Sequence, residues 1–140
     1  VGAAGRDISA PDGTQLGGYW GRVSGSTGVH APVCCRVMAM RESATAVCLI
    51  SLDLIGVDGD TASALRTTAA KAIKGGEWAE VEGTSVLVAC THTHTAPQTH
   101  RTMVGMGVAP PEYMLTLSQA VAAAVADAVT AARPARCVAA

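Results

Sequence analysis

Several features are missing from this chain of 140 residues, and each absence excludes a class of protein. No apolar run approaches the roughly 20 residues that a membrane-spanning helix needs, so the sequence predicts no transmembrane segment. Lys and Arg are scattered and the formal net charge is −1. Without a basic patch, neither nucleic acid nor an anionic membrane is expected as a partner. The opening residues also lack the basic and apolar regions of a secretory signal, which leaves localisation open.

Cysteine usage excludes further classes. None of the five cysteines forms a Cys-X-X-Cys pair, and all lie in apolar segments. Because an odd number cannot pair completely, we expect buried free thiols that behave as small hydrophobic residues. Cys90 is a separate case, since it lies two residues before a histidine. A metal ligand or a Cys-His nucleophile pair therefore stays open there.

The length of the chain corresponds to one domain. A domain of this size buries about two-thirds of the surface that its unfolded chain exposes. We expect residues 1–140 to form this single unit, without internal repeats. The first residue is Val1 rather than methionine, which is consistent with a processed product or a fragment of a longer protein.

The hydrophobic pattern predicts the element order β-β-β-α-β-α-β. The expected strands cover residues 2–8, 33–41, 45–55, 84–90 and 135–140, and the expected helices cover 60–74 and 112–132. A short polar break at 42–44 predicts an antiparallel hairpin, and the first helix makes the strand after it parallel to 45–55. The fold class is α/β, a layered domain with a mixed sheet and at least two packing helices.

Local signals support these boundaries. Asp58 or Asp60 is the expected N-cap of the first helix, and Gly75 with Gly76 its expected C-cap. The segment 45–55 is nearly all apolar, as in a central strand buried on both faces. Residues 9–32 form a long connection with six glycines, and loops of this length in compact domains are often functional.

The most informative motif is Thr-His-Thr-His-Thr-Ala-Pro at residues 91–97, directly after an apolar run. Since side chains on a strand alternate faces, His92 and His94 would project to one side, about 6.5–7 Å apart. Neutral imidazole is a common zinc ligand, so the pair predicts metal-assisted chemistry. The alternative is two strand-end histidines bonded to threonine hydroxyls and backbone carbonyls.

Two more residues are candidates for the same site. Asp53 follows the central strand and is placed to orient a ligand imidazole, or else to serve as a polar strand-end or helix-cap residue. His30 follows the last glycine of the connection 9–32 and would support the site or contact substrate, or else be satisfied within its loop. We therefore expect His94, Asp53 and His30 as catalytic candidates and His92 as the metal ligand.

Five short motifs in order give the chain a family resemblance. They are Gly-Arg-Asp-Ile-Ser-Ala-Pro at 5–11, Gly-Tyr-Trp-Gly-Arg at 18–22, Gly-Val-His-Ala-Pro at 28–32, Ser-Leu-Asp-Leu-Ile-Gly at 51–56, and the histidine motif at 91–97. This order resembles the N-terminal domain of neutral/alkaline (non-lysosomal) ceramidases and their bacterial relatives. Thr95-Ala96 replaces the family's Ser-Gly, and Ala31 stands where an acidic residue is common, so a different pocket shape is expected.

The resemblance implies a zinc-dependent amidase that hydrolyses the N-acyl bond of ceramide, a lipid amide, to sphingosine and a fatty acid. By motif position, His92 matches a zinc ligand and His94 matches a histidine near the scissile amide. The family's other ligands, a His, a Glu and a Tyr, come from later in longer chains. A further C-terminal region or partner chain would then complete the site, and a secreted or periplasmic location would follow.

Two other functional classes remain open. A His-X-His motif after a strand also occurs in amidohydrolase-type (β/α) barrels, although there it is expected on the first strand with no hairpin before it. A non-catalytic structural or interaction domain that kept the sheet but lost the distant ligands is the other alternative. Zinc content per chain would separate an active form from such a relic.

Overall fold

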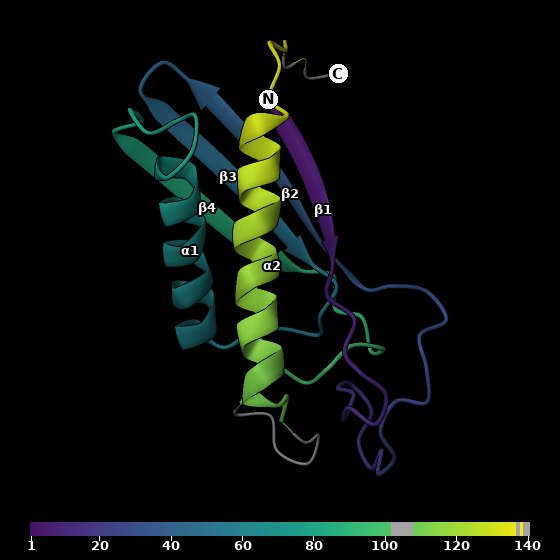
Figure 1. Ribbon diagram of the computed structural model, residues 1–140. Helices are drawn as coiled ribbons and strands as arrows, with labels where there is room; N and C mark the ends of the chain where they lie inside the picture. The colour runs from purple at the N-terminus through teal and green to yellow at the C-terminus, as the bar shows by residue number, and fades with distance from the viewer. Residues whose placement is uncertain (102–107, 137, 139–140) are drawn as a thin grey trace.

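The computed structural model describes residues 1–101, 108–136 and 138 of the chain. Four strands form one sheet in the order β1-β2-β3-β4, and two helices lie side by side on one of its faces (Figure 1). The strands are β1 (Gly2–Asp7), β2 (Cys34–Glu42), β3 (Thr45–Leu52) and β4 (Gly83–Cys90), and the helices are α1 (Gly59–Lys74) and α2 (Pro111–Thr130). The predicted α/β fold class is confirmed.

The sheet is mixed, as the pattern predicts. β2 pairs antiparallel with β1 and β3, whereas β4 pairs parallel with β3 after the crossover through α1. The hairpin between β2 and β3 turns at Ser43 and Ala44, with Ser43 at a φ of 52°. Because barrels of the amidohydrolase type are built from parallel strands, the antiparallel hairpin counts against that alternative.

Both helices begin where local chemistry predicts. The Asp58 carboxylate accepts a hydrogen bond from the Thr61 N–H at 2.8 Å, and Gly75 is the C-cap of α1. Pro111 lies in the first turn of α2, where its fixed φ suits a helix and its missing N–H costs nothing. Among the described residues α2 is also the one helix long and apolar enough to cross a membrane, by length and composition only. Here its apolar side packs on the sheet.

The core lies between the helices and one face of the sheet. Alternate residues of the inner strands are buried there: Cys35, Val37, Ala39, Ala46, Cys48, Ile50 and Leu52. They meet the buried stripe of α2, which consists of Tyr113, Leu117, Val121, Ala124, Val125, Ala128 and Val129. β3 has a neighbouring strand on each side, as expected, but its Val47 and Leu49 are only half-buried. The expectation that both of its faces are buried is wrong.

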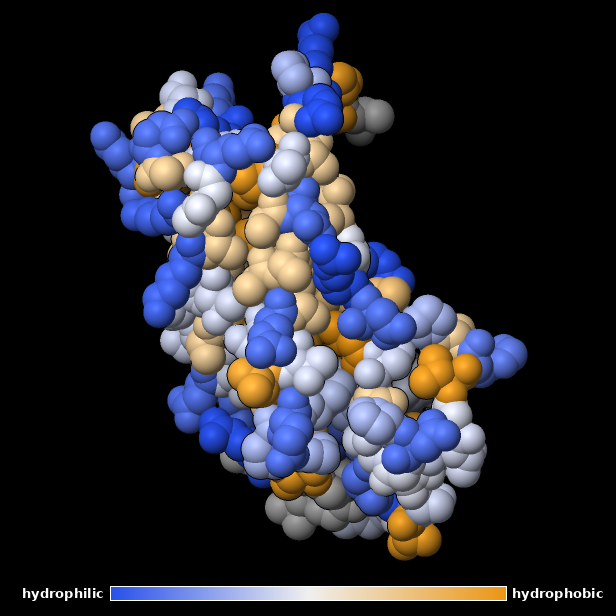
Figure 2. Space-filling model, viewed as in Figure 1, coloured by the Kyte–Doolittle hydropathy of each residue, from blue (hydrophilic) through white to orange (hydrophobic). Residues whose placement is uncertain are grey.

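The second face of the sheet carries no helix in the described part of the chain and is called the open sheet face below. The register places Ala3, Met38, Leu49 and Leu87 in one row across all four strands. Met38 is 38% exposed and Leu87 is 57% exposed, so this row is an apolar stripe open to solvent. Figure 2 shows the opposite, helix-bearing side, where small apolar residues along α2 alternate with hydrophilic ones.

The last predicted strand, residues 135–140, is wrong for the residues that the structure describes. Ala135, Arg136 and Val138 are not in a strand, and 137 and 139–140 lie outside the described residues. The chain instead meets its own beginning, since the N–H of Arg133 donates to the Val1 carbonyl at 2.9 Å. Pro134 follows directly and has no N–H to donate to a strand ladder.

Candidate functional site

The histidine motif lies where two parallel strands end. Leu52 and Cys90 are partners at the carboxyl ends of β3 and β4, so residues that follow both strands meet at one end of the sheet (Figure 1). The Thr91 N–H donates to the Leu52 carbonyl at 2.9 Å, and the His92 N–H donates to the Leu54 carbonyl at 3.0 Å. The backbone of the motif is therefore anchored to the chain that leaves β3.

His92 departs from the expected strand geometry. β4 ends at Cys90, and His92 has a φ of 65°, in the left-handed region that non-glycine residues seldom adopt. The alternation of faces therefore does not continue through the motif, and the prediction that His92 and His94 project to one side of a strand is wrong in its premise. The hydrogen bonds to the chain beyond β3 replace the strand ladder here.

The two imidazoles are nevertheless neighbours. Their ring centroids are 5.3 Å apart, and the ring planes meet at 71°, an edge-to-face arrangement. His92 is exposed and His94 is half-buried. One ring is thus open to an incoming ion or molecule while the other is packed beside it.

A backbone carbonyl determines the tautomer of His92. The Nδ1 atom lies 2.7 Å from the Ile55 carbonyl oxygen, which can only accept a hydrogen bond. Nδ1 must therefore carry the proton, and in the neutral ring the lone pair lies on Nε2. Metal-binding histidines commonly donate their other N–H in this way. No sequence pattern pointed to Ile55, because the contact uses its backbone and not its side chain.

Asp53 lies at the same edge but with other partners. Its Oδ2 accepts hydrogen bonds from the Cys34 N–H at 2.9 Å and from the Arg36 guanidinium at 2.8 Å. Burial by itself would raise the pKa of Asp53, but these bonds and one from Thr91 outweigh it, so the pKa is lowered. Asp53 was expected to accept the hydrogen bond that orients the His92 ring, but the Ile55 carbonyl accepts it instead. A catalytic part for Asp53 stays a prediction.

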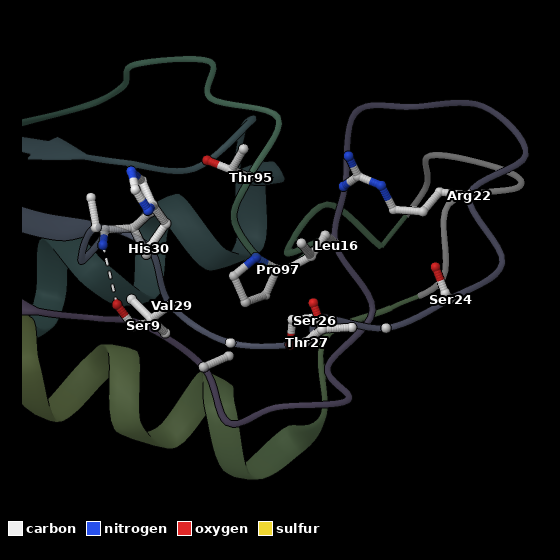
Figure 3. Close-up of a pocket in the computed structure, with 15 residues that line it drawn as sticks. Ser9, Leu16, Arg22, Ser24, Ser26, Thr27, Val29, His30, Thr95 and Pro97 are labelled. Carbon is white, nitrogen blue, oxygen red and sulfur yellow. Dashed lines mark hydrogen bonds between the residues drawn. The ribbon is translucent and has the colours of Figure 1, made fainter.

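His30 lies on the wall of a cavity of about 470 Å³ beside the histidine motif. In Figure 3, His30 and Arg22 stand on opposite sides of this cavity, with Thr95, Pro97 and Leu16 between them. The connection 9–32 forms most of the wall, with hydroxyl groups from Ser24, Ser26 and Thr27. His30 is exposed, and its predicted catalytic part stays a prediction.

The connection 9–32 also holds the far side of the motif. The Gly17 N–H donates to the Ala96 carbonyl at 2.9 Å, and Leu16 forms an isolated bridge with Pro97. The Arg22 guanidinium donates to the His94 carbonyl at 3.0 Å. The length and the glycines of the connection 9–32 predicted a functional loop. The contact between Arg22 and His94 had no signal in the sequence beyond the Gly-Tyr-Trp-Gly-Arg motif.

Ion pairs hold Arg101, the last described residue before 102–107 in the segment that follows the histidine motif. Arg101 Nε donates to Asp58 at 2.7 Å, and the same guanidinium reaches Asp60 at 3.0 Å. The Arg101 guanidinium and the Thr61 N–H hold the pKa of Asp58 well below its usual range. One carboxylate thus caps α1 and tethers Arg101.

The four described cysteines are free thiols, as the sequence predicts, and Cys137 lies outside the described residues. Burial raises the pKa of Cys35 to about 12, that of Cys48 to about 11, and that of Cys90 as well. A raised pKa keeps the thiol protonated in the metal-free chain, which disfavours a role as nucleophile for Cys90, and its part as a metal ligand stays a prediction. Among the described residues, no group of three or more His, Cys, Asp or Glu side chains is arranged to hold a metal ion.

Fold and site together define a class: an α/β domain that presents an imidazole pair beyond the carboxyl ends of two parallel strands. Two solved structures share the fold, the neutral ceramidase from Pseudomonas aeruginosa and a ceramidase complexed with C2. Each has a TM-score of 0.69 and 18% sequence identity and covers 93% of this chain. The chain spans only 21% of the length of either. No family model and no curated protein matches it.

Proposed function

We propose that this domain is part of a zinc-dependent amide hydrolase of the ceramidase type. The observation that carries the proposal is the His92 ring, whose Nδ1 is held by the Ile55 carbonyl and whose Nε2 is left to bind a metal. The neighbouring His94 and the fold shared with two solved ceramidases support it.

The donor set fits zinc in part. An exposed imidazole with a fixed tautomer suits one coordination position of the metal. When bound, zinc would lower the pKa of a coordinated water to about 7 and polarise the amide carbonyl. Catalytic zinc sites use three protein ligands, and the described residues hold no such group. The remaining ligands would come from further polypeptide, either a longer chain or a partner chain.

The chain's own residues have distinct parts in this scheme. His94 would donate a hydrogen bond to the oxyanion that develops from the amide carbonyl, or move a proton to the leaving amine, from about 3 Å. His30 would contact a substituent of the amide in the neighbouring cavity, and Asp53 would hold the strand ends together through Arg36.

The cavity favours an uncharged lipid amide as substrate. Its volume of about 470 Å³ is in the range of sites for small molecules. None of its described lining residues is acidic, and the Arg22 guanidinium is already bonded to two carbonyl oxygens, those of Gly17 and His94. A ceramide-like molecule, with hydroxyl groups and an apolar chain, matches this mixture of serine, threonine and aliphatic side chains.

Zinc titration of the purified chain by calorimetry tests the proposal. We expect weak binding that His92→Ala abolishes and that His100→Ala, a control outside the imidazole pair, preserves. His94→Ala should retain zinc and lose any hydrolysis of a fluorogenic N-acyl amide. Tight equimolar binding unaffected by His92→Ala would overturn the assignment.

A second candidate function has its own observation. The apolar row on the open sheet face is typical of a surface that packs against another polypeptide. A structural or interaction domain that retains this sheet and only part of a metal site would show the same row. Absence of zinc binding together with association through this face would favour it.

A further inference from the structure

The backbone of Gly18 lies directly against the His94 ring. Gly18 has a φ of +100°, a region that disfavours side chains. A Cβ built there would lie 2.4 Å from His94 Cγ and 2.7 Å from His94 Nδ1, far inside van der Waals contact. Only glycine satisfies both conditions, so the imidazole occupies space that any other residue at 18 would fill.

The next residues close around the same histidine. The Tyr19 ring lies edge-on to the His94 ring, with centroids 4.9 Å apart and planes at 73°. The Arg22 guanidinium stacks over Tyr19 at 4.8 Å from its centroid. It also donates to the carbonyls of His94 at 3.0 Å and Gly17 at 3.2 Å. The Arg22 carbonyl is in turn held by the Gln15 side chain at 2.8 Å.

We propose that Gly18, Tyr19 and Arg22 form a clamp that positions the His94 imidazole beside His92. The purpose given to the clamp rests on the proposed function. A fixed distance between the two rings matters when both act on one substrate. These three are positioning residues: they act through His94 and bind neither metal nor amide themselves. Arg22 links the His94 backbone to the loop, and Gly18 with Tyr19 limits the rotation of its ring.

The clamp explains how two rings on a short irregular segment keep one geometry. His92 is fixed from one side, by the Ile55 carbonyl, and His94 is fixed from the other, by a loop more than 70 residues earlier in the chain. Strand geometry positions neither ring, because β4 has ended at Cys90.

Gly18→Ala with Gly21→Ala as a matched control tests the clamp. Gly21 also has a positive φ, +80°, but a Cβ there meets nothing within 4 Å. Both variants carry the backbone strain, and only Gly18→Ala displaces His94. In the metal-free chain at fixed pH, NMR should show the Tyr19 and His94 rings moved apart and the His94 ring resonances shifted in Gly18→Ala alone. Zinc affinity should stay within twofold of wild type in both variants, because the clamp acts on His94 and the proposed metal ligand is His92, which the Ile55 carbonyl holds.

Arg22→Gln and Tyr19→Leu keep the test decisive if Gly18→Ala does not fold. Each should weaken the nuclear Overhauser effects between the clamp and the His94 ring while circular dichroism stays unchanged. Equal effects of Gly18→Ala and Gly21→Ala on the His94 resonances, or unchanged His94 resonances in all three clamp variants, would overturn the clamp. Failure of the wild-type chain to bind zinc would instead count against the proposed function, and the metal-free NMR would still decide the clamp.

Discussion

At the scale of single residues, the site is organised by backbone groups as much as by side chains. The carbonyl of Ile55 orients His92, and the carbonyl of His94 receives Arg22. Sequence patterns report side-chain chemistry, so His92 and His94 were found as a pair. Their actual supports were missed, because any residue at position 55 carries the same carbonyl.

Asp53 provides a prediction at this scale. Its side chain is only 16% exposed, and it accepts bonds from Cys34 and Arg36. Asp53→Asn should lower the free energy of unfolding by about 1–3 kcal/mol near pH 7, the usual loss for hydrogen bonds to a charged group. Urea unfolding at several pH values measures this.

The pH dependence of that loss follows from the pKa of Asp53, which is lower in the folded chain than its ordinary value of 3.8. The charged carboxylate therefore stabilises the fold above about pH 4, and this contribution disappears as the pH falls through the folded pKa. The difference between wild type and Asp53→Asn should shrink in acid. A difference that grows below pH 4 would contradict the account of Asp53.

At the scale of elements, both helices and the four strands were predicted to within about three residues at each end, and the error is an additional strand. The caps of α1, Asp58 and Gly75, act within one turn of the chain, so the sequence carries their signal locally. The expected strand over 135–140 was inferred from apolar composition, but its described residues do not join the sheet. Val1 and Arg133 are hydrogen-bonded to each other instead, although 132 positions separate them in the chain.

Packing of α2 on β1 provides the prediction at this scale. A Cβ at Gly2 would lie 1.9 Å from the Ala128 carbonyl oxygen and 2.9 Å from Ala132 Cα, both backbone atoms that cannot move aside cheaply. Gly2→Ala should therefore separate the helix from the strand and cost about 1–3 kcal/mol of unfolding free energy, as overpacking does. Thermal or urea unfolding followed by circular dichroism measures the change.

Gly5 supplies the control on the same strand. A Cβ there would lie 3.5 Å from the Cys35 carbonyl oxygen, an ordinary contact. Gly5→Ala should leave the unfolding free energy nearly unchanged. If both substitutions cost the same, the close approach of α2 to β1 is not the reason for glycine at position 2.

At the scale of the whole molecule, one face of the sheet has its helices and the other, over the described residues, does not. Composition alone predicted burial of β3 on both sides, because Val47 and Leu49 are as apolar as their buried neighbours Cys48 and Ile50. Leu49 forms, with Ala3, Met38 and Leu87, the apolar stripe of the open sheet face, and Val47 lies on the same face two residues along β3. A hydrophobic pattern reports what a strand is able to bury, and it does not report whether a covering layer is present.

Leu87→Lys tests that view of the open sheet face. Leu87 is 57% exposed, so the substitution should leave the unfolding free energy nearly unchanged while it lowers dye binding and self-association of the chain. Fluorescence of 8-anilinonaphthalene sulfonate and sedimentation velocity measure these two effects.

Leu115 is the matched control, because it is 61% exposed on α2, away from the row. Leu115→Lys should change neither dye binding nor association by a comparable amount. Strong destabilisation by Leu87→Lys alone would mean that the stripe belongs to the folded core of this chain.

The sequence by itself determined the fold class, the hairpin, the crossover, the caps of α1 and the position of the histidine motif after a strand, because these depend on periodicity and on neighbours within a few positions. Tertiary structure alone decided the positive φ of His92, the Ile55 carbonyl at its ring and the approach of Gly18 to His94. Those features arise where segments from three parts of the chain meet. No local pattern records such a meeting, since its geometry depends on how the whole sheet and its loops pack.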